Sequence, residues 1–175
     1  MEVAEFNAFK NNYDKLKTDL VPLIKNIESS KIQEHRDTIT KLHEEPKRWF
    51  LIGKNMIQKN GNMNRSQYIE WIGYGGIEAM KSIMLIVDVL ASLIKEAYAK
   101  ESNKKLKQSE NTSSHHKYKQ MMDKVLDYNH HITGSVLHFI TLYSLYDGPH
   151  TFPMEKMKEY ISNRLTDSRF ELKEK

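Results

Sequence analysis

The side chains of this chain that could do metal chemistry lie in a histidine-rich stretch at 115–138. Asp127 and His131 stand four residues apart, a spacing at which two side chains on a helix can bind one metal ion. His138 lies about 10 Å further along the same axis, so the two histidines cannot share an ion. The Glu-x-x-His pairs of di-iron bundles are absent from the sequence. We therefore expect a solvated polar face here, and neither a metal nor another cofactor.

A second candidate is the stretch RDTITKLH, in which Arg36 and Asp37 are followed by His43 after five residues. It resembles the motif of HEPN-domain ribonucleases, where four to six residues separate an arginine from a following histidine on a helix. The resemblance implies that His43 moves a proton at the RNA 2′-hydroxyl or the leaving oxygen, while Arg36 holds the scissile phosphate. Paired motifs across a dimer would complete that site. The non-catalytic alternative is a solvated Arg36 on a helix whose His43 packs at the edge.

A third stretch, NRSQYIEWIGYGGIEAMKSI at 64–83, resembles the BH1 region of Bcl-2-like proteins. The residues that fall at matching spacing are Asn64, Trp71, Tyr74, Gly75 and Gly76. The resemblance implies a helical bundle in which paired glycines lead into the central apolar helix. A simpler interpretation is that these glycines let a neighbouring helix or turn approach closely.

Other catalytic motifs are absent from the sequence. It contains no cysteine, which removes disulfides, thiol catalysis and cysteine-ligated zinc together. It has no glycine-rich phosphate-binding loop and no nucleophile elbow around a serine. These absences favour a non-enzymatic protein.

The elements that position these residues are organised around the stretch 66–100, the longest apolar-rich segment. It contains no proline, and on a helix its polar residues form one narrow stripe. That stripe consists of Glu70, Glu78, Lys81, Asp88, Ser92, Lys95 and Glu96. A helix that is apolar around most of its circumference belongs at the centre of a helical domain. Its charges also exclude a membrane span, which requires about 20 consecutive apolar residues.

Shorter amphipathic patterns flank this central helix. We expect helices at 3–20, 31–45, 46–59, 115–146 and 153–165. A kink or a fresh start is expected at Pro22, Pro46 should begin a new helix, and Asn64 or Ser66 should cap the central one. The sequence therefore predicts an all-α, single-domain helical bundle of about five to six helices spanning 1–175.

Two charged segments interrupt these patterns. Residues 101–114 contain one apolar residue, which is typical of a mobile loop, and 166–175 form a charged tail. Six lysines lie between Lys100 and Lys119 against two glutamates, so the net charge of +4 is concentrated there. Because the basic residues are 22 lysines and 5 arginines, and arginine is the usual reader of base edges, we expect only weak, non-specific polyanion contact through 100–119.

Aromatic and basic residues outside the expected core give the candidate binding positions. They are Lys104, Lys105 and Lys107 in the basic loop, and Tyr143, Tyr146 and Phe152 around the end of the long 115–146 helix. The chain also has more apolar helix faces than its helices require. We therefore expect a non-enzymatic protein that binds another protein through a helix face, or that self-associates as a homodimer.

Composition gives a further expectation about origin and location. The lysine- and asparagine-rich content is typical of an AT-rich genome, and fits a regulator or inhibitor encoded by a phage, a virus or a mobile element. The N-terminal stretch lacks the apolar core of a signal peptide, and the chain lacks cysteine. An intracellular, cytoplasmic location is therefore expected.

Overall fold

The computed structural model describes residues 2–27, 31–105, 112–146, 154–166 and 168–172, and within these ranges the chain is almost entirely helical. Its α-helices are α1 (Val3–Lys15), α2 (Ile32–Leu42), α3 (Glu44–Asn60), α4 (Arg65–Gly73), α5 (Gly76–Lys105), α6 (Thr112–Leu145) and α7 (Met154–Thr166). A π-helical turn η1 (Leu16–Leu20) and a 3-10 helix η2 (Val21–Asn26) follow α1, and a 3-10 turn η3 (Ser168–Phe170) follows α7. The predicted all-α bundle is confirmed.

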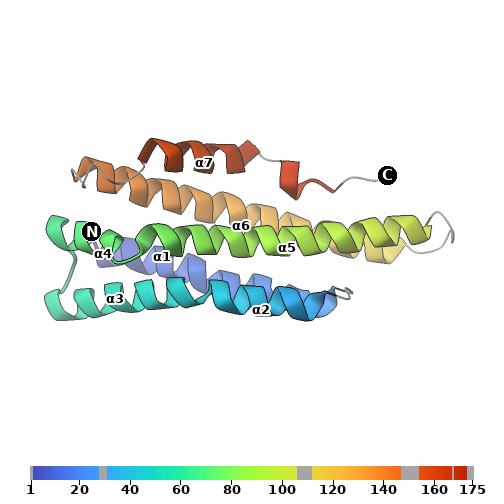
Figure 1. The fold of residues 1–175 in the computed structure, drawn as a ribbon, viewed down its shortest axis with the longest axis horizontal. Coiled ribbons are helices and arrows are strands. Elements are labelled where there is room, and N and C mark those ends of the chain that lie inside the picture. The colour runs from blue at the N-terminus through green and yellow to red at the C-terminus, as the bar shows by residue number, and fades with distance from the viewer. Residues whose placement is uncertain (1, 28–30, 106–111, 147–153, 167, 173–175) are drawn as a thin grey trace.

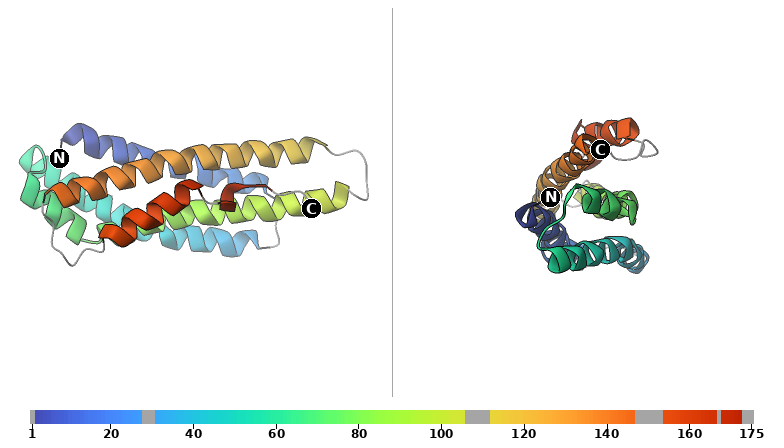
Figure 2. Two further views of the ribbon diagram at one scale, coloured as in Figure 1. Left: turned by 90° about the horizontal axis from the view of Figure 1, so that it is seen from above. Right: turned by 90° about the vertical axis from the view of Figure 1, so that its left-hand side faces the viewer.

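The helices lie side by side along one long axis, and α5 and α6 are the longest (Figure 1). The end-on view in Figure 2 shows two arms, α6 with α7 above and α3 with α2 below, and α1 lies between them on the left of the view. Helix α5 lies between these arms and packs against α6, α3, α2 and α4. The α5–α6 hairpin extends past α2 and α3 at the end of the molecule away from α4 (Figure 1).

Helix α5 supplies the centre of the core, as the sequence predicts. Twelve of its apolar side chains are at most 2% exposed: Ala79, Met80, Ile83, Met84, Ile86, Val87, Leu90, Ala91, Leu93, Ile94, Ala97 and Tyr98. Burying apolar surface contributes about 25 cal/mol per Å², so this helix makes a large part of the hydrophobic stabilisation. Its solvent-facing residues include Glu78, Lys81 and Ser92 from the predicted polar stripe.

The prediction of one uninterrupted central helix at 66–100 is wrong. The chain ends α4 at Gly73 and begins α5 at Gly76, and Gly75 between them has a φ of +104°. This left-handed conformation is accessible to glycine without strain, and it breaks the helix. The start at Asn64 is confirmed, because its side chain accepts a hydrogen bond from the Gln67 amide while the Gln67 side chain accepts one from the Asn64 amide.

The prediction of a basic loop at 101–114 is also wrong at both ends. Helix α5 continues to Lys105 and α6 begins at Thr112, while 106–111 lie outside the described residues. Lysine, glutamate and glutamine are good helix formers, so a segment poor in apolar residues extends a helix that is already formed. Low apolar content in this segment therefore does not indicate a lack of helix.

The region of Pro22 changes helix type where a kink or fresh start was predicted. The amide of Val21 bonds to the carbonyl of Leu16, five residues back, and closes the π-helical turn η1. The tighter η2 then begins around the proline, which has no amide hydrogen to donate. Leu16, Leu20 and Ile24 are all buried, so the change in winding keeps the apolar residues facing the core.

Candidate functional site

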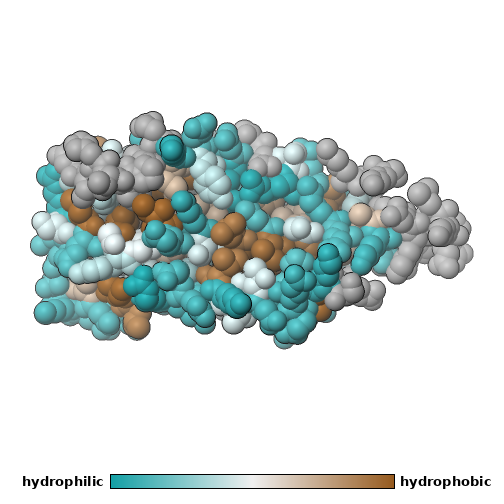
Figure 3. Space-filling model, viewed as in Figure 1, coloured by the Kyte–Doolittle hydropathy of each residue, from teal (hydrophilic) through white to brown (hydrophobic). Residues whose placement is uncertain are grey.

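One side of α5 faces solvent and carries hydrophobic residues among its polar ones. We call this the α5 face, and define it by Glu78, Lys81, Leu85, Val89 and Ser92. Leu85 is 44% exposed and Val89, one turn further, is half-buried. Figure 3 shows hydrophobic surface over the middle of this helix, bordered by hydrophilic residues. Apolar anchors at this spacing are the ones that a docked helix uses.

The aromatic residues predicted for binding are placed differently. Tyr143 is only 5% exposed, so the prediction that it is available on the surface is wrong. It lies on the same side of α6 as Val136 and Phe139, which face the core. Tyr146 is half-buried, with its ring edge-on to that of Tyr68 at 5.6 Å. Phe152 lies outside the described residues.

The predicted basic positions are only partly described. Lys104 and Lys105 belong to the last turn of α5, and Lys107 lies outside the described residues. Lys100, Lys117 and Lys119 flank the same hairpin end, on α5 and α6. The structure therefore brings the lysines on both sides of the 106–111 segment to one end of the molecule (Figure 1).

Arg36 and His43 lie in contrasting environments. Arg36 is exposed on α2, whereas His43 is 7% exposed at the joint between α2 and α3. Its Nδ1 lies 2.7 Å from the hydroxyl of Tyr13, and accepts that hydrogen bond when the imidazole is neutral and protonated on Nε2. Burial, reinforced by the charges of Lys47 and Lys17, lowers the pKa of His43 to about 4. This geometry makes His43 a structural link between α1 and the α2–α3 joint, and the ribonuclease hypothesis stays a prediction.

The residues that resemble a BH1 region have structural roles in this chain. Trp71 stacks on Trp49 with ring centroids 3.9 Å apart, and each indole N–H donates to the other's backbone carbonyl at 2.8 Å. Gly76 lies against the indole of Trp49, since a Cβ at Gly76 would be 3.1 Å from that ring. Asn64 caps α4, and Gly75 makes the turn into α5. The resemblance itself stays a prediction from sequence.

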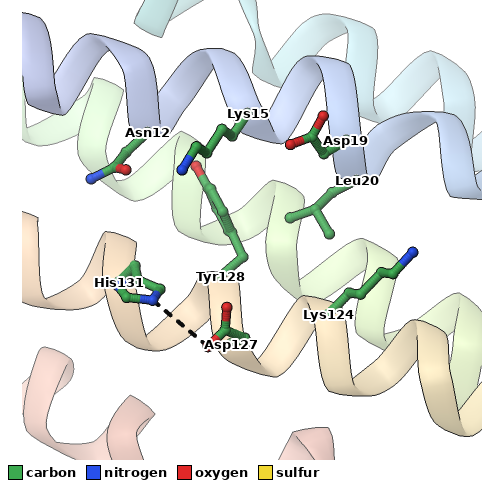
Figure 4. A pocket seen from close by; sticks show the side chains of 8 residues that line it. All are labelled: Asn12, Lys15, Asp19, Leu20, Lys124, Asp127, Tyr128 and His131. Carbon is green, nitrogen blue, oxygen red and sulfur yellow. Dashed lines mark ion pairs between the residues drawn. The ribbon is translucent and has the colours of Figure 1, made fainter.

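A groove lies between α1 with η1 and α6, and we call it the α1–α6 groove (Figure 4). Its volume is about 540 Å³, within the range of small-molecule sites. It is lined by Asn12, Lys15, Asp19, Leu20, Lys124, Asp127, Tyr128 and His131. A second hollow along the same helices shares His131 and adds Phe9, Gly134 and Phe139.

The pair considered above for metal binding lies in this groove. His131 Nε2 is 3.7 Å from Asp127 Oδ1, and both side chains are mostly exposed. In the part of the chain that the structure describes, no three His, Asp or Glu side chains converge on a metal-sized site. The pair is therefore a surface contact on one helix.

A buried polar cluster under α7 was missed by the sequence reasoning. The side chain of Arg164 is fully buried, and its Nη1 donates to both oxygens of Asp88 at 2.8 and 3.0 Å. Its Nη2 donates to Asn129 Oδ1 at 2.9 Å, and Arg169 also contacts Asp88 at 2.8 Å. The cluster fixes α7 and η3 onto α5 and α6. The available signal was an arginine at helical spacing from Met157 and Ile161 on an otherwise apolar face.

No family model, curated protein or solved structure matches this chain. Among the described residues, no helix combines the length and the apolar character that crossing a membrane requires. Function is therefore inferred from the surfaces and side chains themselves.

Proposed function

We propose that this protein binds another protein by accepting a partner helix along the α5 face, and that it acts inside the cell as a non-enzymatic regulator or inhibitor. One observation carries the proposal. Leu85 is 44% exposed in the middle of the central helix, while its neighbours Met84 and Ile86 are fully buried. An exposed leucine at the centre of the most apolar helix lets a partner side chain remove apolar surface from water by packing against it.

The shape of α5 favours a helical partner. The helix spans 30 residues, so it is about 45 Å long and offers a straight track for several turns of a second helix. Leu85 and Val89 are one turn apart, as anchors for a helix must be. Glu78 and Lys81 border them with one charge of each sign, which supplies polar contacts at the rim.

Other exposed hydrophobic residues fit a docking surface less well. The hydroxyl of Tyr74 donates to Glu70 at the turn before α5, and Leu145 is the last residue of α6. Leu51 is 58% exposed on α3, but its surroundings are Lys47, Lys54 and other charged residues of a shallow hollow beside α1. Leu51 therefore provides a matched control, a leucine of similar exposure on another surface.

The test compares the wild type with Leu85→Lys and Leu51→Lys in affinity purification with quantitative mass spectrometry. We expect the wild type and Leu51→Lys to retain the same stoichiometric protein, and Leu85→Lys to lose at least ten-fold of it. Circular dichroism and melting temperature establish that both variants fold. A Leu85→Lys variant that folds and keeps its partner would contradict the proposal.

Self-association through the same face is resolved by the mass of the purified protein. If the partner is a second copy, light scattering will give a dimer for the wild type and for Leu51→Lys, and a monomer for Leu85→Lys. A dimer in all three would place the self-contact elsewhere on the molecule.

A further inference from the structure

The α1–α6 groove contains a buried polar group without a partner. Tyr128 is 7% exposed, and its hydroxyl has no hydrogen-bond partner among the described residues. Figure 4 shows its side chain rising from α6 toward α1, with the hydroxyl ending beside Lys15. A buried hydroxyl that makes no hydrogen bond is destabilising, and such groups in native proteins require an explanation. A ligand that accepts the missing hydrogen bond is one.

The charged group beside the Tyr128 hydroxyl indicates the sign of that ligand. Lys15 from α1 and Lys124 from α6 have no ion pair in the described part of the chain. The acidic residues do have partners, since Asp127 contacts His131 at 3.7 Å and Asp19 accepts a hydrogen bond from Thr18. The groups that meet at the buried end of the groove are the Tyr128 hydroxyl and the Lys15 ammonium, and both donate hydrogen bonds. Together they favour an anionic oxygen group.

The floor of the groove indicates the rest of the ligand. Leu20 and the ring of Tyr128 are apolar and buried, and Phe9 and Phe139 continue this floor into the adjoining hollow. The wall opposite α6 is formed in part by the π-helical turn η1, a type of turn that occurs frequently at functional sites. An apolar floor beneath a polar rim suits an elongated, amphipathic molecule.

We propose that the α1–α6 groove binds a small organic anion, a carboxylate or phosphate group on an apolar chain. Lys15 holds the charged group, the Tyr128 hydroxyl beside it donates a hydrogen bond to the same group, and the apolar chain runs from there toward Phe9 in the adjoining hollow. This site is separate from the α5 face, and it stands whether or not that face binds a protein.

The test is a ¹H–¹⁵N NMR titration of the full chain with three probes of equal chain length: octanoate, octyl phosphate and octylamine. We expect saturable shifts at the groove for octanoate, octyl phosphate or both, and the stronger of the two identifies the charged group. Octylamine should bind at least ten-fold more weakly. The proposal is overturned if neither anion gives saturable shifts, or if octylamine binds as tightly as they do.

Variants connect the binding to the named residues. Lys15→Gln should weaken binding of the anion at least ten-fold, whereas Lys54→Gln, an equal loss of charge on α3, should change the affinity by less than two-fold. Tyr128→Phe should weaken binding several-fold while leaving the melting temperature of the ligand-free protein equal or higher. A purely structural tyrosine would give no loss of affinity, and that result, or unchanged binding by the lysine variant, would overturn the assignment.

Discussion

At the scale of single residues, two helical glycines have opposite surroundings and predict opposite effects of alanine. A Cβ at Gly53 would lie 2.7 Å from the ring of Phe6 and from the indole of Trp71, and both rings are buried in the core. A Cβ at Gly134 would meet nothing within 4 Å. Alanine is about 1 kcal/mol more favourable than glycine within a helix, but overpacking a core costs about 1–3 kcal/mol.

We therefore expect Gly134→Ala to raise the free energy of unfolding by about 0.5–1 kcal/mol, and Gly53→Ala to lower it by about 1–2 kcal/mol. Urea denaturation of both variants beside the wild type measures the two values. Changes of the same sign would show that the close approach of Trp71 to Gly53 is not what determines the residue there.

His43 predicts how stability depends on pH. Its pKa is lowered to about 4 in the folded protein, against about 6.5 in the unfolded chain. Between these pH values the unfolded state binds more protons than the folded state. The contribution of His43 to the free energy of unfolding is therefore complete above about pH 6.5 and is lost as the pH falls toward 4. The loss from this residue is on the order of 2–3 kcal/mol.

The variant His43→Gln should reduce this dependence, because glutamine does not titrate. His131→Gln serves as the control for the substitution itself, since that imidazole is 70% exposed. Thermal unfolding at half-unit intervals from pH 7 to 4 gives the comparison. Equal slopes for the wild type and His43→Gln would argue against a neutral, buried imidazole.

At the scale of helices, the attachment of α7 depends on which partner of a buried ion pair is removed. Arg164 is fully buried, while the side chain of Asp88 is 22% exposed and also contacts Arg169. Asp88→Ala leaves a buried guanidinium without its counter-ion, a change that costs about 3 kcal/mol or more. Arg164→Met keeps most of the volume and leaves Asp88 paired with Arg169.

We therefore predict that Asp88→Ala lowers the free energy of unfolding more than Arg164→Met does. The double variant should lose less free energy of unfolding than the sum of the two single losses. Chemical denaturation of the four proteins in this cycle gives the coupling. Additive losses would show that the two side chains act independently in holding α7.

The helices also show what could be predicted from sequence and what could not. The buried and exposed sides of α5 follow from the order of its own residues, because a helix places neighbours in sequence at fixed angles. The break at Gly75 depends on a backbone conformation that a Gly-Gly pair permits but does not require. The Arg164 cluster joins α5, α6 and α7 across more than 70 residues, and no local pattern contains such a contact.

At the scale of the whole molecule, the candidate surfaces were predicted less well than the fold. Leu85 is on the same side of the helix as Lys81 and Asp88 of the predicted polar stripe, so its exposure follows from the sequence. It was not among the predicted binding residues. Tyr143 was expected at the surface and is buried, because which side of α6 is covered depends on where the other helices pack. The α1–α6 groove needs Lys15 and Tyr128 side by side, and only the packing of distant helices brings them together.

The distribution of charge over the molecule gives a last prediction. Lys100, Lys104, Lys105, Lys117 and Lys119 lie toward the protruding end of the α5–α6 hairpin. Outside 100–119 the chain is neutral overall. A polyanion should therefore contact this end and be displaced by salt, with the slope of log affinity against log salt set by the number of lysines engaged.

The double variant Lys104→Gln with Lys105→Gln should elute from immobilised heparin at a lower NaCl concentration than the wild type, and the slope should decrease by about 1–2. Lys54→Gln with Lys59→Gln removes the same charge from α3, so equal elution of the two double variants would mean that net charge, and not the hairpin end, governs the contact.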